Sequence, residues 1–218
     1  MKLVVCNGSP KPGSNNTEVL VNHFIKGFEQ NNGNTSEIHK LNKLNGKVDI
    51  SDLFNSSEYL LLAFPLYSYS MPAGVKEFIE NLEPFCGNCA DKKIGFIVQY
   101  GFPEATHARP LEKYLEHLCK RLGCRYLGTI IKGGCDGLTR SPRNYGKTLR
   151  DIREIGSRFA TTGQFDKTLL LNFSRPEKQG LALKLMMRVV VRLINRFYWG
   201  ATLKKNGMYD KSFARPYA

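Results

Sequence analysis

Residues 2–28 read KLVVCNGSPKPGSNNTEVLVNHFIKGF, and the fold can be worked out from this stretch. Residues 2–7 form a short apolar run, which is typical of a strand buried on both faces. A polar loop with two glycines follows, and apolar residues then recur at the spacing of one helix face up to Phe28. Asn15, with Glu18 three residues later, is typical of a helix start. The stretch therefore predicts a strand, a loop and a helix in direct succession.

The same order repeats along the chain. We expect further strands at residues 35–41, 58–64, 94–100 and 125–132. Apolar residues at helical spacing lie between and after these strands, at 75–82, 111–122 and 149–159. Strands that alternate with helices through short connections predict a parallel sheet covered by helices on both faces. In such a sheet, ligands bind outside the carboxyl ends of the strands, where the strand order reverses.

The alternation stops near residue 165, so we divide the chain into an α/β domain at 1–165 and a basic helical extension at 166–218. Residues 180–200 are expected to form one long helix, with cations at every fourth position from Lys184 to Arg196. These cations argue against a membrane span. We expect the helix to pack on the domain or on a second subunit, and peripheral contact with an anionic membrane is the alternative.

Composition places the chain among ordinary globular proteins. Apolar residues make up 42% and charged residues 23% of its 218 residues. The apolar run at the start is too short for a signal peptide, so we expect a cytoplasmic protein. Six scattered cysteines do not form the pattern of a disulfide framework.

The chain is strongly basic, with a formal net charge of +13. The cations could face nucleic acid, an anionic membrane or a phosphate-rich cofactor, and a solvated surface is the alternative.

The loop after the first strand is a candidate anion site. Free backbone N–H groups and the helix dipole favour an anion at a helix start. Ser9, Ser14, Asn16 and Thr17 add side-chain donors, and Lys11 adds a positive charge. The loop is not a Walker A motif, because serine stands where that motif requires lysine, and it lacks the G-x-G-x-x-G pattern. An ordinary turn between strand and helix is the alternative.

Two segments together resemble a known family. Residues 7–11 (NGSPK) and 14–17 (SNNT) resemble the phosphate loop of the branch of flavodoxin-like proteins that contains NADPH-dependent FMN reductases and iron–sulfur flavoproteins. Residues 64–73 (FPLYSYSMPA) resemble the P-x-Y-x-x-x-M-P segment of the same branch. The resemblance covers roughly residues 1–165. It implies a doubly wound, five-stranded parallel sheet of order 2-1-3-4-5, with FMN bound at the carboxyl ends of the strands.

The resemblance also implies a set of cofactor-binding residues. The phosphate would lie on Ser9, Lys11, Ser14, Asn16 and Thr17. The isoalloxazine would lie against Pro65, Leu66, Tyr67, Ser68, Tyr69, Ser70 and Met71, with backbone donors from residues 66–70. The loop from Tyr100 to Glu104, after the fourth strand, would form a third wall, in which Gly101 permits close approach and Phe102 could stack on the ring. Ordinary loop packing is the alternative for the aromatic residues.

Flavin chemistry makes few demands on catalytic side chains. By resemblance, NAD(P)H would pass a hydride to the flavin, and a second acceptor would then take the electrons at the same place. We therefore name no certain catalytic residue. His107 could donate a proton, although a histidine at a helix start is more often a capping or surface residue.

The cysteines do not complete a cluster motif. Cys86 and Cys89 are close in sequence, whereas an iron–sulfur cubane usually takes four thiolates. We therefore expect no metal here. A redox dithiol or half of a zinc site is the alternative to two unreactive thiols.

The leading hypothesis is an FMN-dependent NAD(P)H oxidoreductase that reduces a small acceptor such as a flavin, a quinone or a nitro or azo compound. We expect a homodimer, with the aromatic and basic tail at its interface or over the flavin, and no nucleic-acid partner. A non-enzymatic FMN electron carrier is the runner-up, but such carriers tend to be acidic. A basic module for membranes or nucleic acid is the third hypothesis.

Overall fold

The computed structural model describes residues 1–43, 52–56, 58–178 and 180–214. The chain divides into two compact units, Met1–Lys178 and Gln179–Ala218. Each unit is described by itself.

The first unit is built on one parallel sheet of five strands. The strands are β1 (Lys2–Asn7), β2 (Thr35–Lys40), β3 (Tyr59–Pro65), β4 (Lys93–Gln99) and β5 (Arg125–Lys132). Their spatial order is β2-β1-β3-β4-β5, and every neighbouring pair is parallel. The predicted fold class and strand order are therefore confirmed. The strand order reverses between β1 and β3, and this point is where ligands bind in open α/β sheets.

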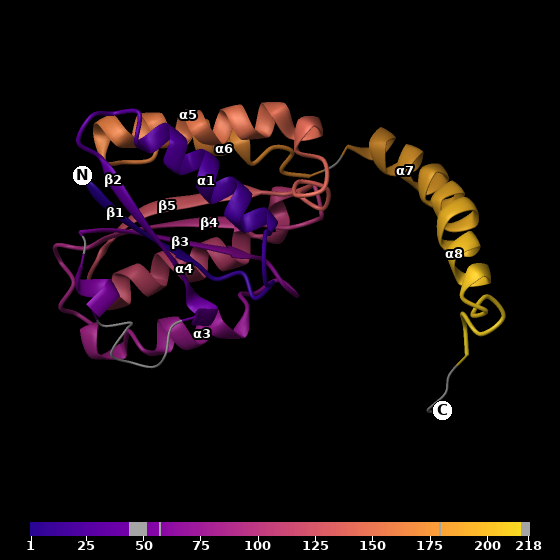
Figure 1. Ribbon diagram of the computed structural model, residues 1–218, viewed down its shortest axis with the longest axis horizontal. Helices are drawn as coiled ribbons and strands as arrows, with labels where there is room; N and C mark the ends of the chain where they lie inside the picture. The colour runs from indigo at the N-terminus through magenta and orange to yellow at the C-terminus, as the bar shows by residue number, and fades with distance from the viewer. Residues whose placement is uncertain (44–51, 57, 179, 215–218) are drawn as a thin grey trace. The chain divides into compact units, whose positions relative to one another are not determined.

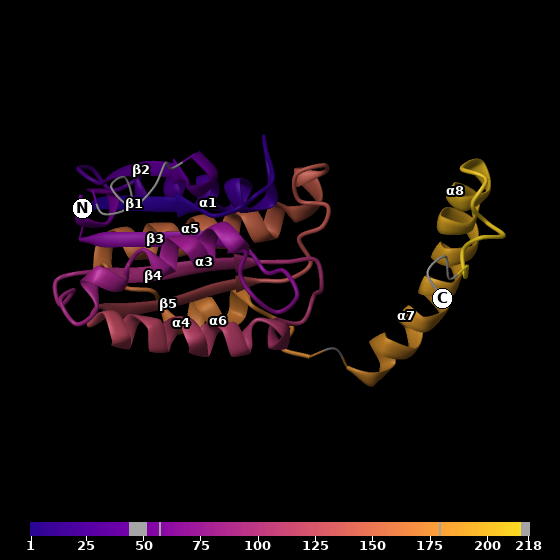
Figure 2. The ribbon, with the colours of Figure 1, turned by 90° about the horizontal axis from the view of Figure 1, so that it is seen from below.

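Helices cover both faces of this sheet, as Figures 1 and 2 show. One face carries α1 (Asn16–Phe28), α5 (Gly146–Thr162) and α6 (Lys167–Phe173), and the other carries α3 (Ala73–Glu80) and α4 (Arg109–Leu122). Short 3₁₀ turns lie at η1 (Leu41–Lys43), η2 (Glu83–Phe85), η3 (Ala105–His107) and η4 (Pro142–Tyr145). Helices α1, α3 and α4 are crossover connections between parallel strands, and α5 and α6 follow the last strand.

The core forms two layers because buried strands point side chains to both faces. On one side, Phe24, Phe159 and Phe165 pack ring against ring. On the same side α1 and α5 approach so closely that a Cβ added at Gly156 would lie 2.1 Å from the Phe24 carbonyl oxygen. This contact fixes α1, whose first turn borders the candidate site.

The first unit extends beyond the predicted division at residue 165. Helix α6 packs against α5 and β5, and Phe173 is buried. The segment after α6 also holds the loop after β4, because Ala105 N–H donates to Pro176 O at 2.9 Å. That residues 1–165 form the FMN-binding domain and residues 166–218 a separate extension stays a prediction.

The second unit is mainly helical. It contains α7 (Leu181–Ile194), the π-helical turn η5 (Asn195–Trp199) and α8 (Gly200–Lys205), which follow one another without a break. The long helix predicted at 180–200 therefore forms and continues to Lys205. No helix in the described residues is long and apolar enough to span a membrane.

Candidate functional site

A cavity of about 430 Å³ opens at the carboxyl ends of the central strands. Four loops contribute to its wall, those that follow β1, β3, β4 and β5. Six of the predicted residues line it: Asn16, Pro65, Leu66, Tyr67, Gly101 and Phe102. Tyr100, from the loop predicted as the third wall, lines it as well, and so do Gln99 and Asp136, which were not predicted as ligands. The fold thus brings the three predicted loops together where the strand order reverses.

The loop after β1 leaves backbone donors at the start of α1. Asn15 caps the helix, because its side-chain oxygen accepts the Glu18 N–H at 2.9 Å. Within the described part of the chain, no hydrogen bond uses the N–H groups of Gly13, Ser14 or Thr17. These donors and the positive end of the helix dipole form an anion-binding corner.

Asn7, the last residue of β1, holds a buried donor with no acceptor. Its side-chain oxygen accepts the Ser9 N–H at 3.0 Å. Its Nδ2 is buried and has no hydrogen-bond partner among the described residues. Such an orphan costs roughly 1–3 kcal/mol, which an acceptor on a ligand would offset. Of the predicted ligands in this loop, Ser9 is buried, and Lys11 and Ser14 are exposed.

Asn16 and Thr17 already use their side chains inside the protein. Asn16 Nδ2 donates to Cys135 O at 2.7 Å, and Asn16 Oδ1 accepts the Thr139 N–H at 3.0 Å and the Thr139 hydroxyl. The Thr17 hydroxyl is fully buried and accepts from Gln99 Nε2 at 3.2 Å. Asn16 therefore connects the loop after β5 to α1. Because the Thr17 hydroxyl is already used, its backbone N–H is the group that could donate to a ligand.

The loop after β3 forms a tight turn. Tyr67 and Ser70 exchange two backbone hydrogen bonds of 2.9 Å, and Ser68 and Tyr69 between them have φ of 48° and 63°. Residues without glycine's freedom are uncommon in this left-handed region, and such strain concentrates at functional sites. Leu66 N–H donates to Gln99 O. Between residues 66 and 70, the backbone N–H groups that have no acceptor among the described residues are those of Ser68 and Tyr69.

Side chains of this turn divide between solvent and core. Tyr67 and Tyr69 are exposed, and the exposed fraction of Tyr69 is 63%. Met71 and Leu66 are partly buried and pack against the core beneath. The two tyrosines are therefore free to contact a ligand, whereas Met71 anchors the turn.

The loops after β4 and β5 close against one another. Gly134 N–H donates to Phe102 O at 3.0 Å, and a Cβ added at Gly101 would lie 2.4 Å from the Asp136 carboxylate. Cys135, beside Asp136, is buried, and burial raises the pKa of its thiol to about 12. Asp136 is the acidic residue among those that line the cavity. The neighbouring Cys135 thiol stays protonated at neutral pH, because its pKa lies well above 7.

His107 lies among aromatic rings beside the cavity. Its ring centroid is 5.5 Å from that of Tyr69 and 5.2 Å from that of Phe102. Its Nε2 is 3.6 Å from a Glu104 carboxylate oxygen. This contact with one residue from each of two predicted walls suits a positioning role.

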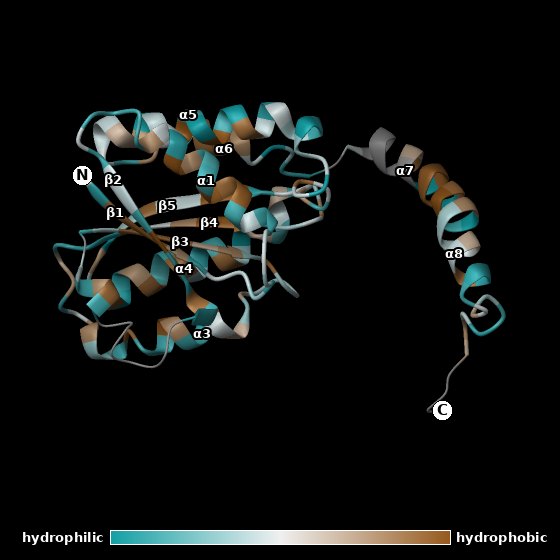
Figure 3. Ribbon diagram, viewed as in Figure 1, coloured by the Kyte–Doolittle hydropathy of each residue, from teal (hydrophilic) through white to brown (hydrophobic). Residues whose placement is uncertain are grey.

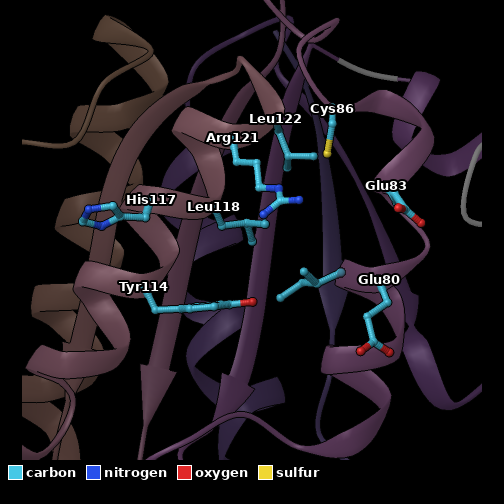
Figure 4. A pocket seen from close by; sticks show the side chains of 9 residues that line it. Glu80, Glu83, Cys86, Tyr114, His117, Leu118, Arg121 and Leu122 are labelled. Carbon is cyan, nitrogen blue, oxygen red and sulfur yellow. The ribbon is translucent and has the colours of Figure 1, made fainter.

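Cys86 and Cys89 lie away from this cavity. They precede β4, so they lie near the amino ends of the strands, whereas the cavity lies at the carboxyl ends. Cys89 is buried and its thiol donates to Phe85 O at 3.1 Å. Cys86 lines a separate pocket of about 500 Å³ between α3 and α4, where Figure 4 shows Glu83 and Arg121 on opposite walls. The described residues contain no group of three or more His, Cys, Asp or Glu side chains placed to hold a metal.

The sequence signal for the missed residues is a polar side chain at the end of a buried strand. Asn7 and Gln99 are the last residues of β1 and β4. In a parallel sheet the carboxyl ends of the strands lie together, so both residues could have been assigned to the site. Asp136 lacks this signal, because it lies beyond Lys132, the last residue of β5, and reaches the cavity through the fold of the loop.

Comparison with known proteins gives one family and many similar folds. A family model described as a flavodoxin-like fold matches residues 1–155. No curated protein resembles the chain closely enough in sequence to count as a match.

Similar solved structures cover nearly all of their own length. An FMN-dependent NADH-azoreductase from Bacillus anthracis, solved in complex with FMN, has a TM-score of 0.57 and 17% identity over 74% of this chain and 100% of its own. An NADPH-quinone reductase from P. pentosaceus has a TM-score of 0.55 and 18% identity, over 74% and 99%. An NAD(P)H:quinone oxidoreductase from Methanothermobacter marburgensis has a TM-score of 0.57 and 16% identity, over 73% and 98%. At such identities the likeness shows the fold alone.

Proposed function

The chain belongs to the flavodoxin-like family, and from this premise we propose that it is an FMN-dependent oxidoreductase that takes electrons from NAD(P)H and passes them to a small acceptor. One observation carries the proposal. A cavity at the point where strand order reverses has an anion-binding corner on one side and exposed aromatic side chains on the other. This combination matches a ligand with a phosphate at one end and a flat ring system at the other.

The phosphate fits the start of α1. The N–H groups of Gly13, Ser14 and Thr17 supply donors, and the exposed Lys11 supplies a positive charge. The orphan Nδ2 of Asn7 lies at the base of the same loop. A phosphoester would accept from these donors and complement the helix dipole.

The ring system fits the opposite walls. Tyr67 from one loop and Phe102 from another both line the cavity, and Phe102 is 68% exposed. Exposed aromatic side chains offer flat apolar surfaces to a conjugated ring. The free N–H groups of Ser68 and Tyr69 would donate to the polar edge of the isoalloxazine.

Bound FMN would supply the hydride and electron chemistry, and the protein would supply binding and orientation. The strained turn at Ser68 and Tyr69 fixes two donors in one geometry. His107 supports the aromatic walls through its contacts with Tyr69 and Phe102, and we assign it a positioning role. NAD(P)H and the acceptor would approach from the side of the exposed aromatic residues. Quinones, flavins, azo and nitro compounds share the flat conjugated structure that such a surface favours.

A non-enzymatic electron carrier on the same fold is less consistent with the charge. The whole chain carries a formal net charge of +13, whereas carriers of this fold tend to be acidic. A homodimer, which the family resemblance implies, stays a prediction.

Anaerobic absorption spectroscopy tests the proposed function. The purified protein is reconstituted with FMN and mixed with NADH or NADPH, and a quinone is added afterwards. We expect the flavin bands to bleach with the nicotinamide and to return with the quinone. Bound FMN that no nicotinamide bleaches would favour the carrier, and protein that binds no FMN would overturn the proposal.

A further inference from the structure

The helix of the second unit exposes an apolar stripe. Met186 and Ile194 lie about two turns apart on one side of α7, Phe197 follows in η5, and all three are exposed. Further exposed apolar side chains of α7 add to its apolar surface: Leu185, Val189, Val191 and Leu193. Val190, between them, is half-buried. Figure 3 shows brown, hydrophobic residues on the coloured part of α7. Such an apolar stripe, exposed over several turns, marks an interaction surface.

Arginines follow a second stripe on the same helix. Arg188, Arg192 and Arg196 are exposed and four residues apart. On an α-helix with about 3.6 residues per turn, Arg192 lies about 40° further round than Arg188, opposite the apolar stripe, and Arg196 follows in the π-helical turn. No carboxylate in the described residues forms an ion pair with these arginines. The sequence from 180 to 209 contains no Asp or Glu, so no acidic residue of this segment can neutralise the arginines. An anionic group that pairs with them must come from outside the segment.

Three aromatic residues in succession occupy the π-helical turn. Phe197, Tyr198 and Trp199 are all exposed, and the exposed fraction of Phe197 is 69%. Tyrosine and tryptophan combine an apolar ring with a polar group, which suits the boundary between lipid and water. A π-turn inside an α-helix is frequent at functional sites.

We propose that the helix from Leu181 to Lys205 is amphipathic and lies in the surface of an anionic membrane, with the Met186–Ile194–Phe197 stripe in the lipid and the arginines at the phosphates. The cations, the aromatic residues and the apolar stripe together match this class of interfacial helix. Among the described residues, no helix is both long and apolar enough to cross a bilayer. A second copy of the chain would cover the apolar stripe but bring no acidic residues from this segment to the arginines. Nucleic acid would meet the arginines and leave the aliphatic residues uncovered.

A single tryptophan gives a direct probe. Trp199 is the one tryptophan of the chain, and it is exposed. The full-length protein is mixed with vesicles of phosphatidylcholine alone or of equal parts phosphatidylcholine and phosphatidylglycerol, and the Trp199 emission is recorded. We expect a blue shift with the anionic vesicles, little change with the neutral ones, and cosedimentation that weakens as salt is added.

Charge variants test the role of the arginines. In the full chain, the triple substitution Arg188→Gln, Arg192→Gln and Arg196→Gln is expected to weaken vesicle binding on the order of 100-fold, since each cation contributes about fivefold near an anionic surface. Glutamine retains good helix propensity, so the helix should persist. The matched control makes the same change at exposed arginines of α5, namely Arg150, Arg153 and Arg158.

The outcomes separate the possible occupants of this surface. Equal loss in both triple variants would show a general charge effect and overturn the proposal. A blue shift that grows with protein concentration without vesicles would identify a second copy instead, and a shift already complete in dilute protein would identify packing within one chain. A shift with DNA but none with vesicles would likewise overturn it. None of these readouts depends on bound FMN, so they stand or fall separately from the proposed oxidoreductase activity.

Discussion

Replacing Asn16 by alanine should loosen the loop after β5 that closes the candidate site. The Asn16 amide makes three hydrogen bonds, one to Cys135 O and two from Thr139. At about 1 kcal/mol each, partly offset because alanine is the better helix former, their loss should lower the free energy of unfolding by about 2–3 kcal/mol. Asp136 lies between these two residues, so its carboxylate should also move from the cavity wall.

Urea unfolding of the FMN-free protein, followed by circular dichroism, measures this effect. Asn31→Ala is the matched control, because within the described residues the Asn31 side chain makes one hydrogen bond, to Ala160 O at 3.1 Å, and its loss should cost about 1 kcal/mol. A double-mutant cycle with Thr139→Ala should show a coupling of about 1 kcal/mol between Asn16 and Thr139. An Asn16→Ala protein within about 0.5 kcal/mol of wild type, or a cycle without coupling, would refute the reasoning.

Three further predictions concern packing, thiol reactivity and charge. Gly156→Ala should destabilise the protein by about 1–3 kcal/mol or more, because its Cβ would lie 2.1 Å from a backbone oxygen of α1, whereas Gly146→Ala, with open space around it, should be nearly neutral in thermal melts. Cys86 is the one cysteine of the described residues that is not buried, so mass spectrometry after brief maleimide treatment near neutral pH should find it labelled first; Cys135, with its pKa raised to about 12, should react well only after unfolding, and early labelling there would contradict its burial. Lys11→Ala should weaken FMN binding by about fivefold at low salt and by less at high salt, and an affinity that does not change with salt would remove Lys11 from the phosphate site.

Most of the fold could be predicted because its signals are local. The fully buried β3 reads as a continuous apolar run, Asn15 supplies the N-cap of α1, and Gly123 ends α4 with a φ of 76°. Helix α6 was not predicted, because it is short and buries only Phe173. Its place is set by packing against α5 and β5, which no local pattern records.

The candidate site was predictable as three loops but not as a set of contacts. Sequence order places loops after strands, and the sheet then brings them to one edge. Which donors are free depends on partners far away in sequence, such as Cys135 and Thr139 for Asn16 or Gln99 for Thr17. Asp136 enters the site only because the chain after β5 folds back over Gly101.

The affinity of the protein for FMN compared with riboflavin tests the central claim most directly, since the two ligands share the ring system and differ in the phosphate. Titration of protein freed of bound flavin, followed by flavin fluorescence, gives both dissociation constants. If the start of α1 holds the phosphate with two or more charge-assisted hydrogen bonds, FMN should bind at least about 100-fold more tightly than riboflavin. Equal affinity for the two flavins, or no binding of either, would contradict the account.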